Sequence, residues 1–438
     1  MFELILLFSI LFFIFSWRNF ELSLYSVFLL LPTYRIQFNI FNLPFNLLSL
    51  IIWIVVLVFF IKNIKKIPNI FKDFKTKIKS PNIFSPFRLP IILILISSYI
   101  AIFFSSKTVK AFGIFKSYFL ESLFLFVILV FTIRTKSQFK KIIYSLGILS
   151  ILIFFLGLYQ KLTGDFVYNT TNIIESSRIT TFFGYPNANG LILLPIFFLT
   201  LLNLFEDKKI YLKIFNILVL VLSVITIFWA KSESAIVAII AGILISISFK
   251  LFNNKKFFIF VSSCVIIVAF IFPFTIRAPY KIDEPGTKVY SVQEKLLLKD
   301  LSGQVRRQMW KETIDFIKDN PITGAGLVSY QDKVASYHKF NYIEIFLYPH
   351  NIFLNFWVTL GLLGVISFFW LIIAVFRVCI KSYFNSSKEQ IFILLTMLVT
   401  IIQGIVEVPY FKNDLSIIWW LIILGAILFK KESFGKSY

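Results

Sequence analysis

A few side chains in this sequence could take part in chemistry. The chain has only two histidines, His338 and His350, and a neutral histidine near pH 7 can accept a proton from a hydroxyl group. Arginine stays charged and its planar fork matches phosphate oxygens, so Arg178, Arg306 and Arg307 are candidates for binding an anionic group. The further residues of interest are Lys231, Trp310 and Asn351.

Each candidate also has a plain structural explanation. His350 follows a proline and could simply begin a helix, whereas His338 is expected to be a surface residue of a loop. Arg306 and Arg307 could be solvated charges on an amphipathic helix, and Arg178 could anchor a helix at a membrane interface. Residue type alone leaves both explanations open. A metal site held by protein ligands is not expected, because histidine and cysteine are both scarce.

The amino-acid composition indicates the class of protein in which these residues are placed. Apolar residues make up 58% of the 438 positions and charged residues only 15%, against about 25% in soluble proteins. A helix that crosses a membrane uses about 20 residues, so the apolar positions suffice for roughly a dozen spans. Soluble enzymes, disordered chains and disulfide-rich secreted domains are excluded. We predict an all-α polytopic membrane protein with 12–13 transmembrane helices.

The apolar runs divide the chain into four parts. Residues 1–160 hold the first group of helices, 161–274 a central group, 275–349 one large loop, and 350–438 the last helices. The short second run ends at Pro32, which leaves the number of spans at 12 or 13. The runs lie near residues 2–16, 21–34, 45–62, 89–106, 112–133, 141–160, 189–205, 210–229, 234–250, 256–274, 350–377, 390–408 and 414–429.

The distribution of charge predicts the orientation. The net charge is +22, and in a membrane protein such an excess indicates basic cytoplasmic loops rather than binding of nucleic acid. Residues 62–88 hold eight Lys or Arg against one Asp. If the spans alternate from residue 45 onward, every basic turn falls on this same side. The opposite, outer side then receives residues 161–188, 230–233, 275–349 and 409–413.

The large loop (residues 275–349) has eleven basic and nine acidic residues, so it is expected to be a small folded element. Ser291 and Glu294 have the spacing of a capping box that begins a helix. A second, amphipathic helix is predicted from about Gln304 to Asp319, where Asn320 and a proline stop it. The pattern predicts a loop that packs on the bundle or lies on the membrane.

Five short stretches give the sequence a resemblance to a known family. Residues 178–190 read Arg-Ile-Thr-Thr-Phe-Phe-Gly-Tyr-Pro-Asn-Ala-Asn-Gly, residues 306–310 begin with Arg and end with Trp, and residues 320–326 read Asn-Pro-Ile-Thr-Gly-Ala-Gly. His-Asn at 350–351 and Gly-Leu-Leu-Gly at 361–364 follow. In this order, they resemble the O-antigen ligase and O-antigen polymerase superfamily, over roughly residues 150–375.

The resemblance implies a GT-C-like membrane glycosyltransferase. Such an enzyme moves a glycan from a polyprenyl diphosphate, such as undecaprenyl diphosphate, to an acceptor hydroxyl in the synthesis of cell-surface polysaccharide such as lipopolysaccharide. It implies inversion without a metal or other cofactor, and as partners a lipid-linked glycan donor, a glycan or lipid acceptor, and membrane lipids. The expected location is the cytoplasmic (inner) membrane, with the active site facing the periplasm or the cell exterior.

The same resemblance implies roles for individual residues. His350 becomes the candidate catalytic base, and Arg178, Arg306 and Arg307 become candidates for binding the donor diphosphate. The supporting candidates are Asn351, Lys231 and Trp310. The family often has Ser-Arg near residue 232, where this chain reads Lys-Ser-Glu-Ser from Lys231, so the cation stands one position earlier. Glu407, close to a proline at the outer end of an apolar run, is expected to be an ordinary helix-end residue.

Other functions remain open at this point. A polymerase of the same superfamily uses the same kind of donor on the same face. A lipid-linked glycan flippase or other transporter would more often show charges buried across the bundle and inverted repeats, and neither is evident in this sequence.

The charge pattern makes a testable prediction about topology. Residues 62–88 should lie in the cytoplasm and the large loop outside, because the basic excess of 62–88 is held on the inner side. In intact cells, Ser80→Cys should not react with a thiol reagent that cannot cross the membrane. Labelling of that cysteine from outside would contradict the orientation.

Overall fold

The computed structural model describes residues 2–40, 43–65, 86–165, 178–283, 288, 290–340, 342–385 and 387–430. Nearly all of its regular structure is helical, which confirms the predicted all-α polytopic membrane fold. Seven helices of the described part are long and apolar enough to cross a membrane, and five shorter apolar helices accompany them. The exact number of spans, 12 or 13, stays a prediction.

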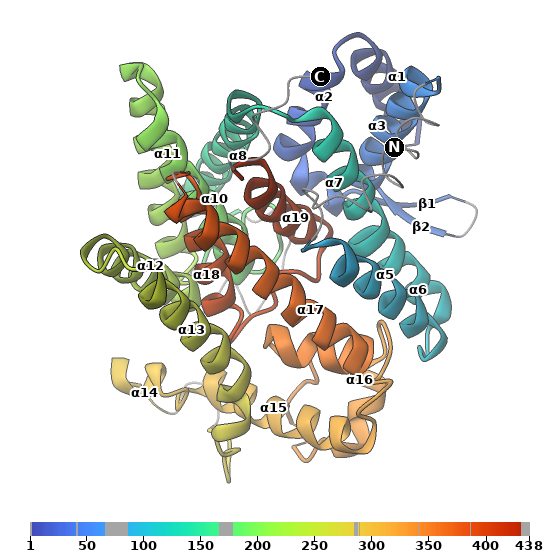
Figure 1. Ribbon diagram of the computed structural model, residues 1–438. Coiled ribbons are helices and arrows are strands. Elements are labelled where there is room, and N and C mark those ends of the chain that lie inside the picture. Colours follow the sequence, from blue (N-terminus) through green and yellow to red (C-terminus); the bar gives the residue numbers. More distant parts are fainter. Residues whose placement is uncertain are drawn as a thin grey trace.

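The first part of the chain contains helices and one hairpin that the sequence did not predict. The hairpin pairs two antiparallel strands, and its Phe38 and Phe45 stand opposite each other with stacked rings. Figure 1 shows this hairpin projecting sideways from the bundle. The elements are α1 (Phe2–Arg18), α2 (Phe20–Leu29), the 3-10 turn η1 (Leu31–Arg35), β1 (Gln37–Ile40), β2 (Leu43–Asn46), α3 (Leu47–Asn63) and α5 (Arg88–Phe103).

Capping residues fix the ends of the longest of the central helices. The helix α8 starts at a capping box, in which the Thr135 side chain accepts from the Gln138 amide and the Gln138 side chain bonds back to Thr135. It ends at Gly164 in the left-handed conformation that favours glycine. The elements are α6 (Thr108–Ile114), a π-helical turn η2 (Phe115–Leu120), α7 (Glu121–Thr132), α8 (Lys136–Thr163), α10 (Asn187–Glu206), α11 (Ile210–Trp229), α12 (Glu233–Leu251) and α13 (Lys255–Thr275).

The last helices form the middle of the bundle. The helix α18 (Gln390–Gln403) packs against α10 and α12, and α17 (Ile352–Phe384) packs against α5, α13 and α18. The remaining helix, α19 (Asn413–Leu428), is almost wholly buried beside α7. The segments on either side of α18 are therefore held firmly, which matters for the site described below.

Ion pairs tie together the basic turns at one end of the bundle. Lys136 pairs with Glu389, and Lys140 pairs with Asp207, which also accepts from the Tyr144 hydroxyl at 2.7 Å. These ion pairs bring the turn at 134–141 together with the segments around Asp207 and Glu389, and the grouping of all basic turns on one side stays a prediction. Which side faces the cytoplasm stays a prediction.

The large loop lies across the other end of the bundle. Figure 1 shows its helices α14 (Val292–Leu296), α15 (Leu301–Asp319) and α16 (Tyr330–Val334) together at that end. The capping box of Ser291 and Glu294 is present as predicted. The helix α15 ends at Asp319 as predicted but starts earlier than expected, because the Asp300 side chain accepts from the Gly303 amide and caps it.

The turn that follows α15 docks into a break in α17. Gly361 has φ +72°, and the Leu362 amide donates to the Ile322 carbonyl at 3.0 Å. On the other side of the turn, the Ala325 amide donates to the Val358 carbonyl at 2.6 Å. A Cβ on Gly361 would stand 2.1 Å from the Ile322 carbonyl oxygen, so only glycine fits. The two glycine-containing motifs therefore join α15 to α17.

His338 is not the surface residue that the sequence suggested. Its side chain is only 8% exposed, and its Nδ1 lies 3.0 Å from an oxygen of the buried Glu312 carboxylate on α15. Its Nε2 lies 3.0 Å from the Ile343 carbonyl oxygen. Both partners can only accept hydrogen bonds, so the ring satisfies both only when both nitrogens carry hydrogen. His338 thus fastens the end of the large loop to α15.

We predict that the attachment of the large loop through His338 weakens as the pH rises above about 6.5. Burial alone would lower the pKa of His338, but the bonds to Glu312 and Ile343 outweigh it and raise the pKa above its ordinary value of about 6.5. The stabilisation is therefore complete below about pH 6.5 and is lost as pH rises through the raised pKa. Hydrogen-exchange protection of residues 334–340, corrected for intrinsic rates, should fall in that range.

Glu312→Gln provides the matched variant, since it keeps the size of the side chain and removes the charge. Its protection in residues 334–340 should be lower at neutral pH and should change less with pH. Wild-type protection that stays constant between pH 6 and pH 9 would contradict this role of His338.

Candidate active site

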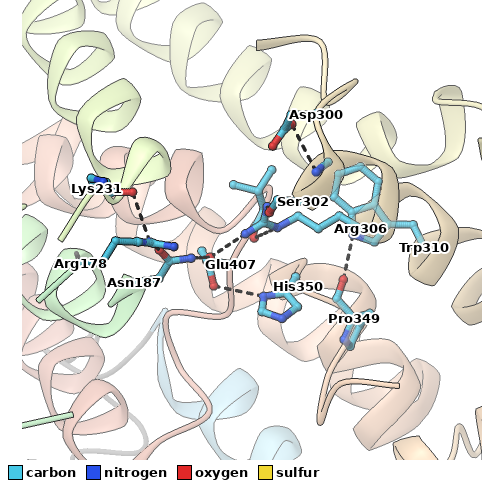
Figure 2. A network of polar contacts seen from close by, with 12 residues as sticks. Arg178, Asn187, Lys231, Asp300, Ser302, Arg306, Trp310, Pro349, His350 and Glu407 are labelled. Atoms are coloured by element: carbon cyan, nitrogen blue, oxygen red, sulfur yellow. Dashed lines mark hydrogen bonds and ion pairs between the residues drawn. The ribbon is translucent and has the colours of Figure 1, made fainter. Parts of the chain in front are cut away.

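A buried carboxylate, Glu407, gathers side chains from three distant segments. Its Oε1 accepts from Asn187 Nδ2 at 2.7 Å and from Arg306 Nη2 at 3.0 Å. Its Oε2 lies 3.2 Å from His350 Nδ1. Figure 2 shows these side chains pointing toward Glu407, with Arg178 behind Asn187. We call Arg178, Asn187, Arg306, His350 and Glu407 the Glu407 cluster.

The backbone on both sides of Glu407 is fixed by its neighbours. Glu407 lies in the turn between α18 and α19. The Ile352 amide donates to the Gly404 carbonyl at 2.8 Å, and Asn351 Nδ2 donates to the Ile405 carbonyl at 3.0 Å. The Glu407 side chain is only 1% exposed. Its carboxylate is therefore held in one place at the start of α17.

His350 is presented to the cluster by an unusual backbone conformation. Its φ is +50°, which is uncommon for a residue with a side chain. The next residue, Asn351, caps α17, because its side chain accepts from the Phe353 and Leu354 amides at 3.0 and 2.9 Å. Glu407 is an acceptor only, so His350 Nδ1 carries the hydrogen that it donates. His350 Nε2 makes no hydrogen bond to a described residue and can accept a proton.

Aromatic side chains surround the imidazole. The rings of Phe346 and Tyr348 lie edge-on to the His350 ring, with centroids 5.4 and 5.2 Å away. Trp310 is fully buried, and its Nε1 donates to the carbonyl of Pro349 at 2.8 Å. Trp310 therefore links α15 to Pro349, the residue that directly precedes His350. This contact explains why a tryptophan follows Arg306 and Arg307 in the sequence motif.

Arg306 is held by three acceptors yet keeps donors to spare. Its Nε donates to the Val406 carbonyl at 3.0 Å, its Nη1 to the Ser302 hydroxyl, and its Nη2 to Glu407. A guanidinium has five N–H groups, so one remains on each terminal nitrogen. Its side chain is 15% exposed, and these two N–H groups can reach a phosphate oxygen.

Arg178 is positioned from the other side of the cluster. Its Nε donates to the Ala230 carbonyl at 2.9 Å, and its Nη2 donates to Asn187 Oδ1 at 2.7 Å and to the Lys231 carbonyl at 3.2 Å. The two N–H groups of Nη1 make no hydrogen bond to a described residue. Asn187 thus links the guanidinium of Arg178 to the carboxylate of Glu407.

The cluster keeps Glu407 ionised. Burial alone would raise the pKa of this carboxyl, but His350, Arg306 and Asn187 together lower its pKa to about 2. The carboxylate therefore keeps its charge at any pH at which the protein works. A permanently ionised, immobile partner fixes which nitrogen of His350 carries hydrogen.

The remaining candidates lie at the edge of the cluster. Lys231 has φ +49° and contributes its carbonyl oxygen to Arg178, while its side chain lines a cavity of about 290 Å³ with Trp229 and Glu233. Among the described residues, no hydrogen bond or ion pair joins Arg307 to the cluster, and its buried Nε has no hydrogen-bond partner. Among the described residues, no group of three or more His, Cys, Asp or Glu side chains could hold a metal ion.

Sequence reasoning missed Glu407, which was expected to be an ordinary helix-end residue. A carboxylate at the end of an apolar run is a functional candidate by default, and that was the available signal. Its significance depends on Arg306 and His350, which lie 101 and 57 positions away in the chain. Asn187 was inside a recognised motif, but nothing in the motif showed that it bridges two charged groups.

Comparison with known proteins finds a family match for part of the chain. Residues 218–369, about a third of the chain, match the family model described as O-antigen ligase. The matched segment contains Lys231, Arg306 and His350, whereas Arg178 and Glu407 lie outside it. No curated protein matches the chain. The match confirms the resemblance to the O-antigen ligase superfamily, so this chain is a polytopic membrane protein that carries a domain of that family and acts in membrane glycan processing.

Proposed function

We propose that the chain transfers a glycan from a polyprenyl diphosphate donor to an acceptor hydroxyl at the outer face of the cytoplasmic membrane. The observation that carries this proposal is the placement of His350, whose Nε2 bonds to no described residue, beside Arg178 and Arg306, which keep N–H groups that no described residue uses. Such an arrangement matches the two needs of the reaction, which are a base for the acceptor and charge stabilisation for a diphosphate.

The acceptor hydroxyl is a poor nucleophile and needs a base. His350 Nε2 takes the hydroxyl proton while the acceptor oxygen attacks the anomeric carbon of the donor sugar. Glu407 stabilises the imidazolium that forms, since its Oε2 holds the opposite ring nitrogen. The proton thus resides on the ring until it passes to solvent.

The departing group is the lipid diphosphate. The bond between the anomeric carbon and the phosphate oxygen breaks, and the electron pair leaves with the diphosphate. Arg306 and Arg178 stabilise the added negative charge through their remaining N–H groups. Attack and departure on opposite faces of the sugar make this a single displacement with inversion, for which these residues suffice without a metal.

The acceptor distinguishes a ligase from a polymerase. A ligase transfers the glycan to a different molecule, whereas a polymerase uses a second lipid-linked glycan of the same kind. We propose the ligase-type reaction on the family match, with the polymerase as the alternative. Purified chain in proteoliposomes, given one lipid-linked donor with and without a separate acceptor, tests both: elongation of the donor alone would indicate a polymerase, and no transfer in any mixture would contradict the proposal.

We predict that His350→Ala lowers turnover about 10²–10⁴-fold, which is the usual contribution of a general base. The KM for the donor should change little. Turnover and the donor KM of the variant and the wild type, measured in proteoliposomes, check both statements.

Glu344→Gln is the control for this prediction. Glu344 is an exposed carboxylate of the large loop and should be replaceable without loss of activity. If His350→Ala or His350→Gln keeps wild-type turnover, His350 is not the base. A large loss in Glu344→Gln instead would transfer that role to Glu344.

We also predict different outcomes for the two neighbouring arginines. Arg306→Ala should lower kcat/KM about 10- to 150-fold, because a hydrogen bond to a charged group contributes about 1.5–3 kcal/mol. Arg307→Ala should have a smaller effect, since no hydrogen bond or ion pair joins Arg307 to the cluster among the described residues. Arg306→Lys should recover only part of the loss, because an ammonium lacks the planar fork. Equal effects of Arg306→Ala and Arg307→Ala would remove Arg306 from its proposed place.

A further inference from the structure

Beside the Glu407 cluster lies a lysine that forms no ion pair with a described carboxylate. Lys412 occupies the same turn as Glu407, directly before α19. Among the described residues, its Nζ makes one long hydrogen bond, to the Tyr34 hydroxyl at 3.3 Å. No carboxylate of a described residue lies within 4.0 Å of it, although an ammonium has three hydrogens to donate. The hydrogen-bonding capacity of this cation is therefore mostly unused.

Aromatic rings rather than anions surround this ammonium. Its Nζ lies 4.0 Å from the centre of the Tyr185 ring and 5.7 Å from that of Tyr34. Cation–π contacts hold a cation in place but do not neutralise it. Burial lowers the pKa of Lys412 to about 8, which still leaves it charged at neutral pH. The charged groups that face it are Asp414, Arg35 and Glu407.

The rings around Lys412 connect it to the cluster. Tyr185 is two residues before Asn187, and Tyr348, which packs on the imidazole, is two residues before His350. Two carboxylates face Lys412, but Glu407 binds Arg306 and His350, and Asp414 accepts from the Leu415 amide and forms no ion pair with Lys412. A partly buried cation that makes no direct ion pair with a described residue is suited to an anionic ligand that arrives from outside the chain.

We propose that Lys412 is a phosphate-binding residue and that it binds a phosphate of the polyprenyl diphosphate donor. The inference rests on the proposed function for the identity of the donor. The ammonium is a compact point charge on a flexible stem, so it can follow a phosphate, whereas Arg306 is fixed by three acceptors. Lys412 would then contribute to donor binding rather than to proton transfer.

Binding of a polyprenyl diphosphate without a glycan tests this assignment directly. The full chain in nanodiscs of neutral lipid should bind it, and Lys412→Met should weaken that binding about 10- to 100-fold. Lys412→Arg keeps the charge and should bind nearly as well as the wild type. Lys318→Met is the matched control, because Lys318 on α15 is 68% exposed, and it should bind like the wild type. Wild-type affinity in Lys412→Met would overturn the proposal.

Two further arms identify the ligand. Inorganic diphosphate whose binding depends on Lys412 would support recognition of the phosphate itself. Phosphatidylglycerol that competes equally well, with the same dependence on Lys412, would show a site for anionic membrane lipid and overturn the assignment to the donor. If Lys412→Met fails to fold, the wild type still decides, since its affinity for polyprenyl diphosphate should fall as pH rises above about 8, and a constant affinity up to pH 10 would contradict the proposal.

Kinetics separate this inference from the proposed function. In a transferring enzyme, Lys412→Met should raise the donor KM by the same factor and leave kcat within a few-fold. A lower kcat with an unchanged KM would indicate a structural role and count against the proposal. Binding that depends on Lys412 in a chain that transfers no glycan would contradict the proposed function and leave the assignment of Lys412 intact.

Discussion

The structure at this end of the bundle depends on satisfying one buried carboxylate. An isolated charge is costly to remove from water, and removing one partner of a buried ion pair costs about 3–5 kcal/mol. Glu407 avoids that cost by bonding to Asn187 at the start of α10, to Arg306 on α15 and to His350 before α17. Three segments that are distant in the chain must therefore meet at this carboxylate.

Several contacts attach the large loop to the bundle and so hold α15 in place near Glu407. Trp310 bonds to the carbonyl before His350, and the turn after α15 fits the break in α17 at Gly361. His338 attaches the last segment of the loop to Glu312 on α15. The motifs that gave the family resemblance are thus of two kinds. Some supply the charged groups of the cluster, and others hold the loop in the position from which those groups can meet.

Much of the fold followed from the sequence because the determinants are local. Apolar runs predicted the helices, the capping box at Ser291 was visible as a spacing, and the end of α15 was marked by Asn320 and a proline. The hairpin of β1 and β2 was missed, because its strands are short and interrupted by polar residues. The break at Gly361 was missed as well, since it depends on the approach of the Ile322 carbonyl rather than on the surrounding apolar pattern.

The candidate site was harder to predict than the fold. Arginine and histidine were recognisable by type, so Arg178, Arg306 and His350 could be named in advance. The way in which these three residues contact one another could not be predicted, because it is set by Glu407. The sequence neighbours of Glu407 are apolar and do not mark it as functional. The positive φ of His350 was equally hidden, since it arises where Asn351 caps α17 and the carbonyl of Pro349 is held by Trp310.

In the proposed reaction, the base and the residue that stabilises the diphosphate are both held by one carboxylate, Glu407. Oε1 of Glu407 holds Arg306, and Oε2 of the same carboxylate holds His350. A displacement of the carboxylate moves the arginine and the imidazole together, so their separation is preserved. Rates of group transfer are sensitive to misplacement of about 1 Å, and independent errors in two groups would add. A rigid, permanently ionised anchor shared by both groups limits that error, which gives a physical reason for burying a charge at this position.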